Sequence, residues 1–218
     1  MTNDLRTRFL RIRKVKEHSK VDKNQLIQDL QRYCSLASEL GATEARIIGR
    51  EIFLIDPRVR LKCRVPLCEH YGTNINCPPY TMNVGEFARV VNLYSSAVIV
   101  KWEFTRDQIL SNDPRYLRSI HEALTQMEAA AFYDGYYFAT AFASGPCRRA
   151  FCPALPCQAL IEPVKGCRYP LLARPSMEAM GFDVYRIACN IGWEIYPVGC
   201  QVPEEIHKVI RMGILLVA

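Results

Sequence analysis

Apolar positions recur at helical spacing in two long segments, and these segments predict the two main helices of the chain. Between residues 24 and 40, apolar side chains return every three or four positions, and Gly41 follows as a stop signal. The longer segment covers residues 114–134. It begins at Asp113-Pro114, an N-cap acceptor followed by proline at the first helical position. Both segments therefore predict helices with one apolar face turned toward a core.

Shorter apolar runs between the helices predict strands. The run ARIIGREIFLID indicates two short strands around a turn at Gly49, AVIVKWEF indicates a buried strand, YYFATAFAS indicates another, and further apolar strands run through the C-terminus. Short helices are predicted near 84–95 and 183–191. The expected fold class is α/β (α+β), with one mixed sheet covered by helices. The order helix, strand, cysteine loop, helix, strand occurs twice, which predicts two pseudo-repeated halves.

Composition supports one globular domain over residues 24–218, preceded by a basic arm over residues 1–23. Half of the 218 residues are hydrophobic, so the chain has enough apolar surface for a core without covalent staples. No apolar stretch approaches the roughly 20 residues of a membrane-spanning helix. The N-terminus lacks a continuous hydrophobic region, which argues against a secretory signal. We therefore expect a cytoplasmic protein, in which ten cysteines serve as ligands rather than as disulfides.

The basic arm carries nearly all of the net charge of +6. Residues 1–24 hold eight Lys/Arg against three Asp/Glu, whereas the remaining chain is nearly neutral. Such an arm suits an anionic partner, and it is equally typical of a solvated extension. No sequence signature of a nucleic-acid-binding fold accompanies it, so nucleic acid is not the expected partner.

Seven of the ten cysteines lie in two tight loops, and this is the strongest chemical signal in the chain. The first loop has a C-x4-C-x8-C pattern, and the second has a C-x4-C-x4-C-x9-C pattern. The predicted metal and cofactor ligands are Cys63, Cys68, Cys77, Cys147, Cys152, Cys157 and Cys167. Thiolates are soft ligands, and several in one irregular loop favour iron–sulfur clusters or zinc.

The spacing within these loops favours iron–sulfur clusters over zinc. Structural zinc sites usually contain a close C-x2-C pair, and neither loop has one. Iron–sulfur clusters are larger than a single ion and accept looser cysteine spacings. Prolines beside the ligands, such as Pro78 and Pro153, would stiffen the loops. The expected cofactors are iron–sulfur clusters of the [4Fe–4S] type, with zinc as the alternative.

The motifs around the loops resemble a known family. Cys77-Pro78-Pro79 follows the first cysteine pair, and R-P-S-M-E-A-x-G follows the second loop at residues 174–181. In these features the chain is similar to an uncharacterised family of cysteine-rich predicted metal-binding proteins, found largely in anaerobic microbes. The resemblance covers about residues 45–200. It implies a sulfur-ligated metal site on the seven clustered cysteines and does not supply a reaction.

The number of cysteines suggests that the two loops differ. Four in the second loop could complete the coordination of one [4Fe–4S] cluster, whereas three in the first loop would leave one position open. Another side chain, water or a substrate could fill that position. The candidate side chains are Cys34, Cys189, Cys200 and His70. Cys34 lies on an apolar helical face, and Cys189 and Cys200 flank Gly192-Trp193, so all three are expected first as core residues.

Polar residues beside the loops have two interpretations each. Tyr71, Asn74 and Asn76 would donate hydrogen bonds to sulfur or would serve as ordinary turn residues. His70 would ligate, relay protons or face solvent. The basic side chains that flank the thiolates, and would offset their charge, are Lys62, Arg64, Arg148 and Arg149. Arg174 and Glu178 are expected to form an i,i+4 pair at a helix start that Ser176 caps.

Three functions follow from these observations. The first is an iron–sulfur protein that transfers electrons to a partner enzyme, and the second is an enzyme in which an open cluster iron binds substrate. The third is a zinc-stabilised binding module with a basic arm. The first is the leading prediction and implies a redox partner protein. The sequence does not decide whether the chain is an enzyme, and it leaves open a homo-oligomer.

Overall fold

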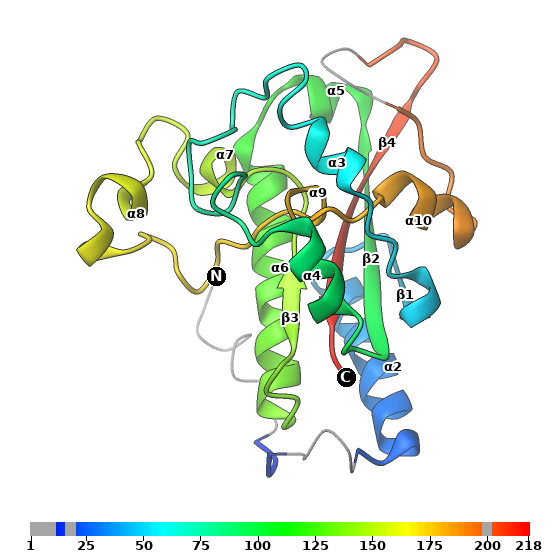
Figure 1. Ribbon diagram of the computed structural model, residues 1–218. Helices are drawn as coiled ribbons and strands as arrows, with labels where there is room; N and C mark the ends of the chain where they lie inside the picture. Colours follow the sequence, from blue (N-terminus) through cyan, green and yellow to red (C-terminus); the bar gives the residue numbers. More distant parts are fainter. Residues whose placement is uncertain (1–11, 16–20, 198–201) are drawn as a thin grey trace.

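A four-stranded antiparallel sheet lies between two layers of helices (Figure 1). The computed structural model describes residues 12–15, 21–197 and 202–218. The strands are β1 (Glu44–Gly49), β2 (Ser96–Thr105), β3 (Thr140–Phe142) and β4 (Lys208–Leu216), in the order β1-β2-β4-β3. The predicted α+β class is confirmed, and every strand pair in the sheet is antiparallel.

The two long helices cover one face of the sheet. They are α2 (Lys23–Glu39) and α6 (Pro114–Tyr133), close to the predicted bounds. Asp113 caps α6 by accepting the Arg115 N–H, as the Asp-Pro pair predicts. The core beneath them includes Leu30, Tyr33, Ile120, Leu124 and Met127, all at most 2% exposed. Burial of this continuous apolar layer provides the main driving force for the fold.

The opposite face of the sheet is covered by shorter elements. These are α4 (Val84–Val91), α9 (Met177–Met180) and α10 (Val184–Asn190). Phe87 of α4 packs edge-on against Phe142 and Phe182, with ring centroids 5.2 and 5.3 Å away. The order helix, strand, cysteine loop, helix, strand thus occurs twice, as α2-β1-α4-β2 and α6-β3-α10-β4. The second strands of the two halves, β2 and β4, pair at the centre of the sheet.

Several boundaries differ from the sequence-based predictions. No second strand follows Gly49, where the chain forms η2 (Arg50–Ile52) and then a single bridge between Ile55 and Phe182. The reason is topological, because β1 ends opposite Ser96, whereas the first cysteine loop lies at the other end of the sheet (Figure 1). The segment between β1 and the first cysteine loop returns along the sheet and makes only brief backbone pairing with other segments. Its backbone bonds join Asp56 to Gly181 and Asp183 to Leu54.

Two other elements are shorter than expected, and the C-terminal segment forms one strand. α4 ends at Val91 rather than at 95. β3 keeps only three residues of YYFATAFAS, because Tyr136 to Ala139 form a turn that leaves Phe138 56% exposed. At the C-terminus several strands were expected, whereas the described residues form one, β4.

Part of the basic arm lies against the helices. The Arg13 N–H donates to the Tyr133 carbonyl at 2.8 Å, and its guanidinium pairs with Asp29 at 2.9 Å. Asp29 is 2% exposed and also accepts from Tyr136. This contact lies at the end of the helices remote from the cysteine loops (Figure 1). In the described ranges, no helix is long and apolar enough to cross a membrane.

Gly213 allows α6 to approach β4 closely. A Cβ at this position would lie 2.4 Å from Leu124 Cδ1 and 3.1 Å from the Phe142 carbonyl oxygen. Leu124 is fully buried and has little space to move. We expect Gly213→Ala to lower the free energy of unfolding by about 1–3 kcal/mol, measured by urea denaturation. Gly85→Ala is the matched control, since its Cβ would meet only Asn83 Oδ1 at 3.3 Å and alanine favours helix. Equal stability of the two variants would contradict the packing argument.

Candidate metal centre

The two cysteine loops lie side by side at one end of the sheet. The first follows α3 (Pro57–Leu61), and the second contains α7 (Cys147–Phe151) and α8 (Gln158–Ile161) (Figure 1). Asn76 of the first loop donates from Nδ2 to Cys147 Sγ of the second at 3.3 Å. The Cys147 S–H in turn donates to Asn74 Oδ1 at 3.5 Å. The loops are therefore in direct contact.

The four cysteines of the second loop border a common cavity. Its lining includes Cys147, Cys152, Cys157 and Cys167, together with the aromatic rings of Phe151 and Tyr169. Phe151 and Tyr169 stack with ring centroids 5.2 Å apart. Asn74 and Ile75 of the first loop also line this cavity, so both loops build its wall. The arrangement presents four soft donors to one cavity that is partly open to solvent.

Local backbone hydrogen bonds shape the first loop. The Cys68 N–H donates to the Cys63 carbonyl at 3.1 Å, and the Cys77 N–H donates to the Asn74 carbonyl at 3.2 Å. Asn74 is only 1% exposed, and its Oδ1 accepts from the Asn76 N–H at 3.1 Å. These turns place the thiols of Cys63, Cys68 and Cys77 close enough to interact electrostatically.

Burial keeps several of these thiols protonated at neutral pH in the metal-free chain. It raises the pKa of Cys77 to about 11, an effect that the Asn74 side chain partly offsets. Burial raises the pKa of Cys147 to about 12, although the hydrogen bond from Asn76 acts in the opposite direction. A metal ligand must be the thiolate, so binding of a metal here would release protons.

Arg60 is a cation beside the first loop that sequence reasoning missed. Its Nη1 donates to the carbonyls of Met82 and Ala179, both at 3.0 Å. Burial lowers the pKa of Arg60, while the neighbouring Cys63 and Cys77 thiols act in the opposite direction. Its spacing of three residues before Cys63 is the signal in the sequence that would have indicated it. Arg60 can offset negative charge that develops on sulfur.

The flanking basic residues lie in several environments. Lys62 and Arg64 are exposed, and the Arg64 guanidinium lies 5.8 Å from the Tyr71 ring centroid. Arg148 is half-buried and donates to the Leu155 carbonyl at 3.2 Å. Arg149 is also half-buried and belongs to a different cavity, which is described below.

The four side chains considered for the open coordination position of the first loop do not share one environment. His70 is half-buried and faces Glu69 with an Nε2 to Oε1 distance of 3.3 Å, so it does not simply face solvent. Cys34 packs against the core beneath α2, as predicted, and burial raises its pKa to about 11. Cys189 is exposed, so its prediction as a core residue was wrong; α10 buries Val184, Ile187 and Ala188 instead. Cys200 lies outside the described residues.

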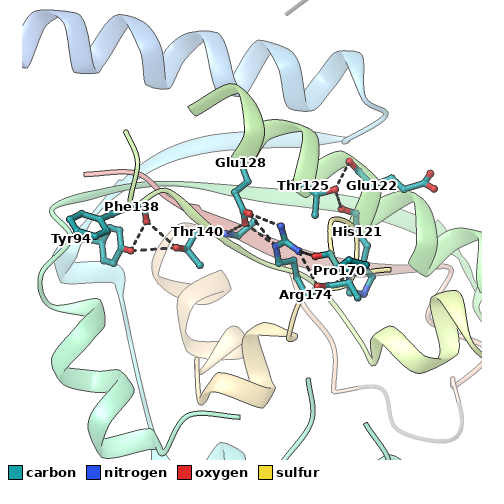
Figure 2. A network of polar contacts seen from close by, with 11 residues as sticks. Tyr94, His121, Glu122, Thr125, Glu128, Phe138, Thr140, Pro170 and Arg174 are labelled. Atoms are coloured by element: carbon teal, nitrogen blue, oxygen red, sulfur yellow. Dashed lines mark hydrogen bonds and ion pairs between the residues drawn. The ribbon is translucent and has the colours of Figure 1, made fainter. Parts of the chain in front are cut away.

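Arg174 pairs with a partner that the sequence did not predict. Its guanidinium binds Glu128 of α6, with Nη2 to Oε1 at 2.6 Å and Nε to Oε2 at 3.0 Å (Figure 2). The expected pair with Glu178 does not form, because Arg174 precedes the helix and points toward α6. Ser176 does cap α9, accepting the Ala179 N–H at 3.1 Å.

This ion pair fastens the end of the second loop to the fold. Arg174 Nη1 donates to the Pro170 carbonyl at 3.1 Å, and Glu128 also accepts the Ala141 N–H (Figure 2). The Arg174 N–H faces His121 Nδ1 at 3.4 Å. His121 is fully buried, and burial, together with the charge of Arg174, lowers its pKa to about 4. The motif around Arg174 therefore positions the polypeptide that returns from Cys167.

Glu178 lies beside the first loop rather than in a helix-start pair. Its charge acts on both Cys63 and Arg211. No described residue forms a salt bridge or side-chain hydrogen bond with its carboxylate. The M-E-A motif marked this residue in the sequence, but its neighbours come from elements that are remote in the chain.

The donor set fits a sulfur-ligated metal, because seven soft donors lie on two loops that are in contact. As the side chains stand, no group of three or more Cys, His, Asp or Glu residues in the described ranges is close enough to hold a metal ion. The fold and this cysteine arrangement define a cysteine-rich α+β protein with a candidate metal centre. Residues 46–217 match the family DUF2284, described as predicted metal-binding protein, and the chain belongs to that family. No curated protein and no solved structure matched the chain.

Proposed function

We propose that this protein binds iron–sulfur clusters, of the [4Fe–4S] type, and transfers electrons to a partner enzyme. The observation that carries the proposal is the single cavity bordered by Cys147, Cys152, Cys157 and Cys167. Four cysteines are the usual ligand set of a [4Fe–4S] cluster, and such a cluster supplies one-electron transfer when bound. Cys63, Cys68 and Cys77 would hold a second cluster. Membership in a predicted metal-binding family supports the coarser part of this proposal.

The surrounding residues suit a redox role. Phe151 and Tyr169 limit access of water to the second-loop thiols, and burial of this kind affects reduction potential. Asn76 donates a hydrogen bond to Cys147 Sγ, which favours the more negatively charged state of a sulfur ligand. Arg60 acts in the same direction at the first loop.

Exposed apolar side chains around both loops support a partner protein. They are Leu61, Val65 and Leu67 on the first loop and Leu155, Ile161, Val164 and Leu171 on the second, each at least 48% exposed. Exposed apolar groups that gather in one region mark interaction sites. Lys62, Arg64 and Arg168 lie among them, so the expected partner presents an apolar surface with an acidic rim.

Anaerobic purification followed by iron, sulfide and zinc analysis tests the proposal. We expect a brown protein with about eight irons and equal sulfide per chain, and an electron paramagnetic resonance signal after reduction. A colourless protein with stoichiometric zinc would overturn it and favour the zinc-stabilised module.

Asn76→Ala is expected to lower the reduction potential of the second-loop cluster. The variant removes the amide donor 3.3 Å from Cys147 Sγ, so the reduced state loses stabilisation. A redox titration monitored by visible absorption measures the shift. Asn92→Ala is the control, since Asn92 donates only to the Ala88 carbonyl at the end of α4. The same potential in both variants would show that the Asn76 amide does not tune the cluster.

A second candidate function is an enzyme with an open cluster iron in the first loop. Three thiols gather there, whereas Cys34 packs in the core beneath α2 and Cys189 is exposed on α10. The first loop therefore has no fourth cysteine of its own in the described residues. A change in the resonance signal on adding a small ligand such as cyanide would favour this function over simple electron transfer.

A further inference from the structure

Two arginines beside the cysteine loops form no ion pair with any residue that the structure describes. Arg149 of α7 and Arg211 of β4 are half-buried and line the same small cavity between β2, α5 (Arg106–Leu110), α6 and α7. Among the described residues, neither guanidinium forms a hydrogen bond or a salt bridge. Arg211 Nε is buried and has no partner. Half-buried charges are normally paired, so this pair suggests a missing anion.

The two guanidinium groups also repel each other. Burial lowers the pKa of Arg211; Glu178 counteracts this, while the charge of Arg149 lowers it further. Arginine nevertheless stays protonated, so the repulsion is not relieved by loss of a proton. An anion between the two would relieve it, and the planar fork of each guanidinium matches an oxyanion.

The acidic residues nearby do not fill this role. Asp113 lines the cavity, but Arg115 already neutralises it with Nε and Nη2 at 2.7 and 2.6 Å from Oδ2. Glu178 attracts Arg211 but lies beyond salt-bridge distance, since no such bridge forms. Cysteine thiols do not act on Arg211, in contrast to Arg60, whose charge is coupled to Cys63 and Cys77.

We propose that Arg149 and Arg211 bind a small oxyanion, the carboxylate or phosphate group of a metabolite, in this cavity. Gln108, Asn112 and Tyr116 provide polar side chains around it, and Phe104 and Leu117 form its apolar wall. The cavity is small, about 20 Å³, and partly open to solvent, so the anionic group would lie at its mouth beside the two arginines, with the remainder of the molecule outside. Arg149 lies in α7, two residues after Cys147, and the two cysteine loops are in contact. The oxyanion site is thus adjacent to the cysteine loops.

This inference does not depend on which metal the cysteines hold. The arginines, their burial and the cavity are features of the protein chain alone. If the first loop carries a reactive metal, the same site would present an anionic substrate to it. If the chain carries zinc or no metal, the oxyanion site is still expected.

Isothermal titration calorimetry tests the site with inorganic phosphate and, separately, with acetate. The full chain is titrated as purified, at constant ionic strength, and its iron and zinc contents are measured in the same sample. We expect saturable binding of at least one anion, which identifies phosphate or carboxylate as the preferred group. Arg149→Gln and Arg211→Gln should each weaken that binding about tenfold or more, because each removes a charge-assisted contact.

Arg89→Gln is the matched control, since Arg89 is an exposed arginine of α4 that lines neither the oxyanion cavity nor the cysteine cavity. It should bind the anion within about twofold of the wild type, a difference below about 0.4 kcal/mol. If Arg211→Gln fails to fold, as circular dichroism would show, Arg149→Gln decides alone. No saturable binding by the wild type, unchanged binding by the Arg149 and Arg211 variants, or an equal loss in Arg89→Gln would overturn the proposal. Anion binding without iron would keep this site and reject the iron–sulfur function.

Discussion

Cys157→Ser is expected to remove about half of the iron and half of the acid-labile sulfide from the protein. Cys157 is one of the four thiols at the second-loop cavity that would together complete the coordination of one [4Fe–4S] cluster, so its removal is expected to destabilise that cluster. The expected content falls from about eight irons to about four per chain. Iron and sulfide analysis of anaerobically purified protein measures the loss, and the visible absorption should fall in proportion.

Cys189→Ser provides the matched control for this substitution. Cys189 is exposed on α10, and its thiol is no part of either cysteine loop. Its iron content should equal that of the wild type. Retention of all iron in Cys157→Ser would contradict the assignment of the second loop, and loss in both variants would point to general destabilisation.

Arg174→Met is expected to lower the free energy of unfolding by about 2–4 kcal/mol. The substitution leaves the Glu128 carboxylate, only 18% exposed, with the Ala141 N–H as its remaining partner. Removing one partner of a buried ion pair costs about 3–5 kcal/mol, and the partial exposure here reduces that cost. Chemical denaturation of the two proteins under the same anaerobic conditions measures the difference.

Two further variants distinguish the contribution of the ion pair to stability from a general loss of stability on substitution. Arg174→Met combined with Glu128→Leu should recover part of the stability, because no unpaired carboxylate remains. Arg118→Met removes an exposed i,i+4 pair with Glu122 and should change stability by less than about 1 kcal/mol. A double variant less stable than Arg174→Met, or an equal loss in Arg118→Met, would argue against a specific role for the Arg174–Glu128 pair.

Local signals predicted much of the fold. The Asp113-Pro114 start of α6 and the apolar stripe of α2 depend on residues a few positions apart, so periodicity and capping rules describe them well. The segment after Gly49 was misjudged because its course is imposed by the position of the first cysteine loop. Its apolar residues pack against α9 and α10 rather than joining the sheet.

The candidate site was predictable in composition but not in arrangement. Cysteine spacing identified seven residues, four of which border one cavity in the structure. The contact between Asn76 and Cys147 and the pair Arg174–Glu128 join residues 71 and 46 positions apart. No periodic pattern encodes such contacts. Cys189 was wrongly predicted as a core residue, because its apolar neighbours in the sequence do not indicate which face of α10 it occupies.

Asn74 connects the two cysteine loops through a single buried side chain. Its amide accepts from Cys147, faces Cys77 and lines the second-loop cavity. Neither loop can therefore open without disturbing the other, and the pair forms one cooperative unit rather than two independent modules. Amide hydrogens in both loops should then exchange with solvent through the same opening event, so that protection gained by one loop is shared by the other.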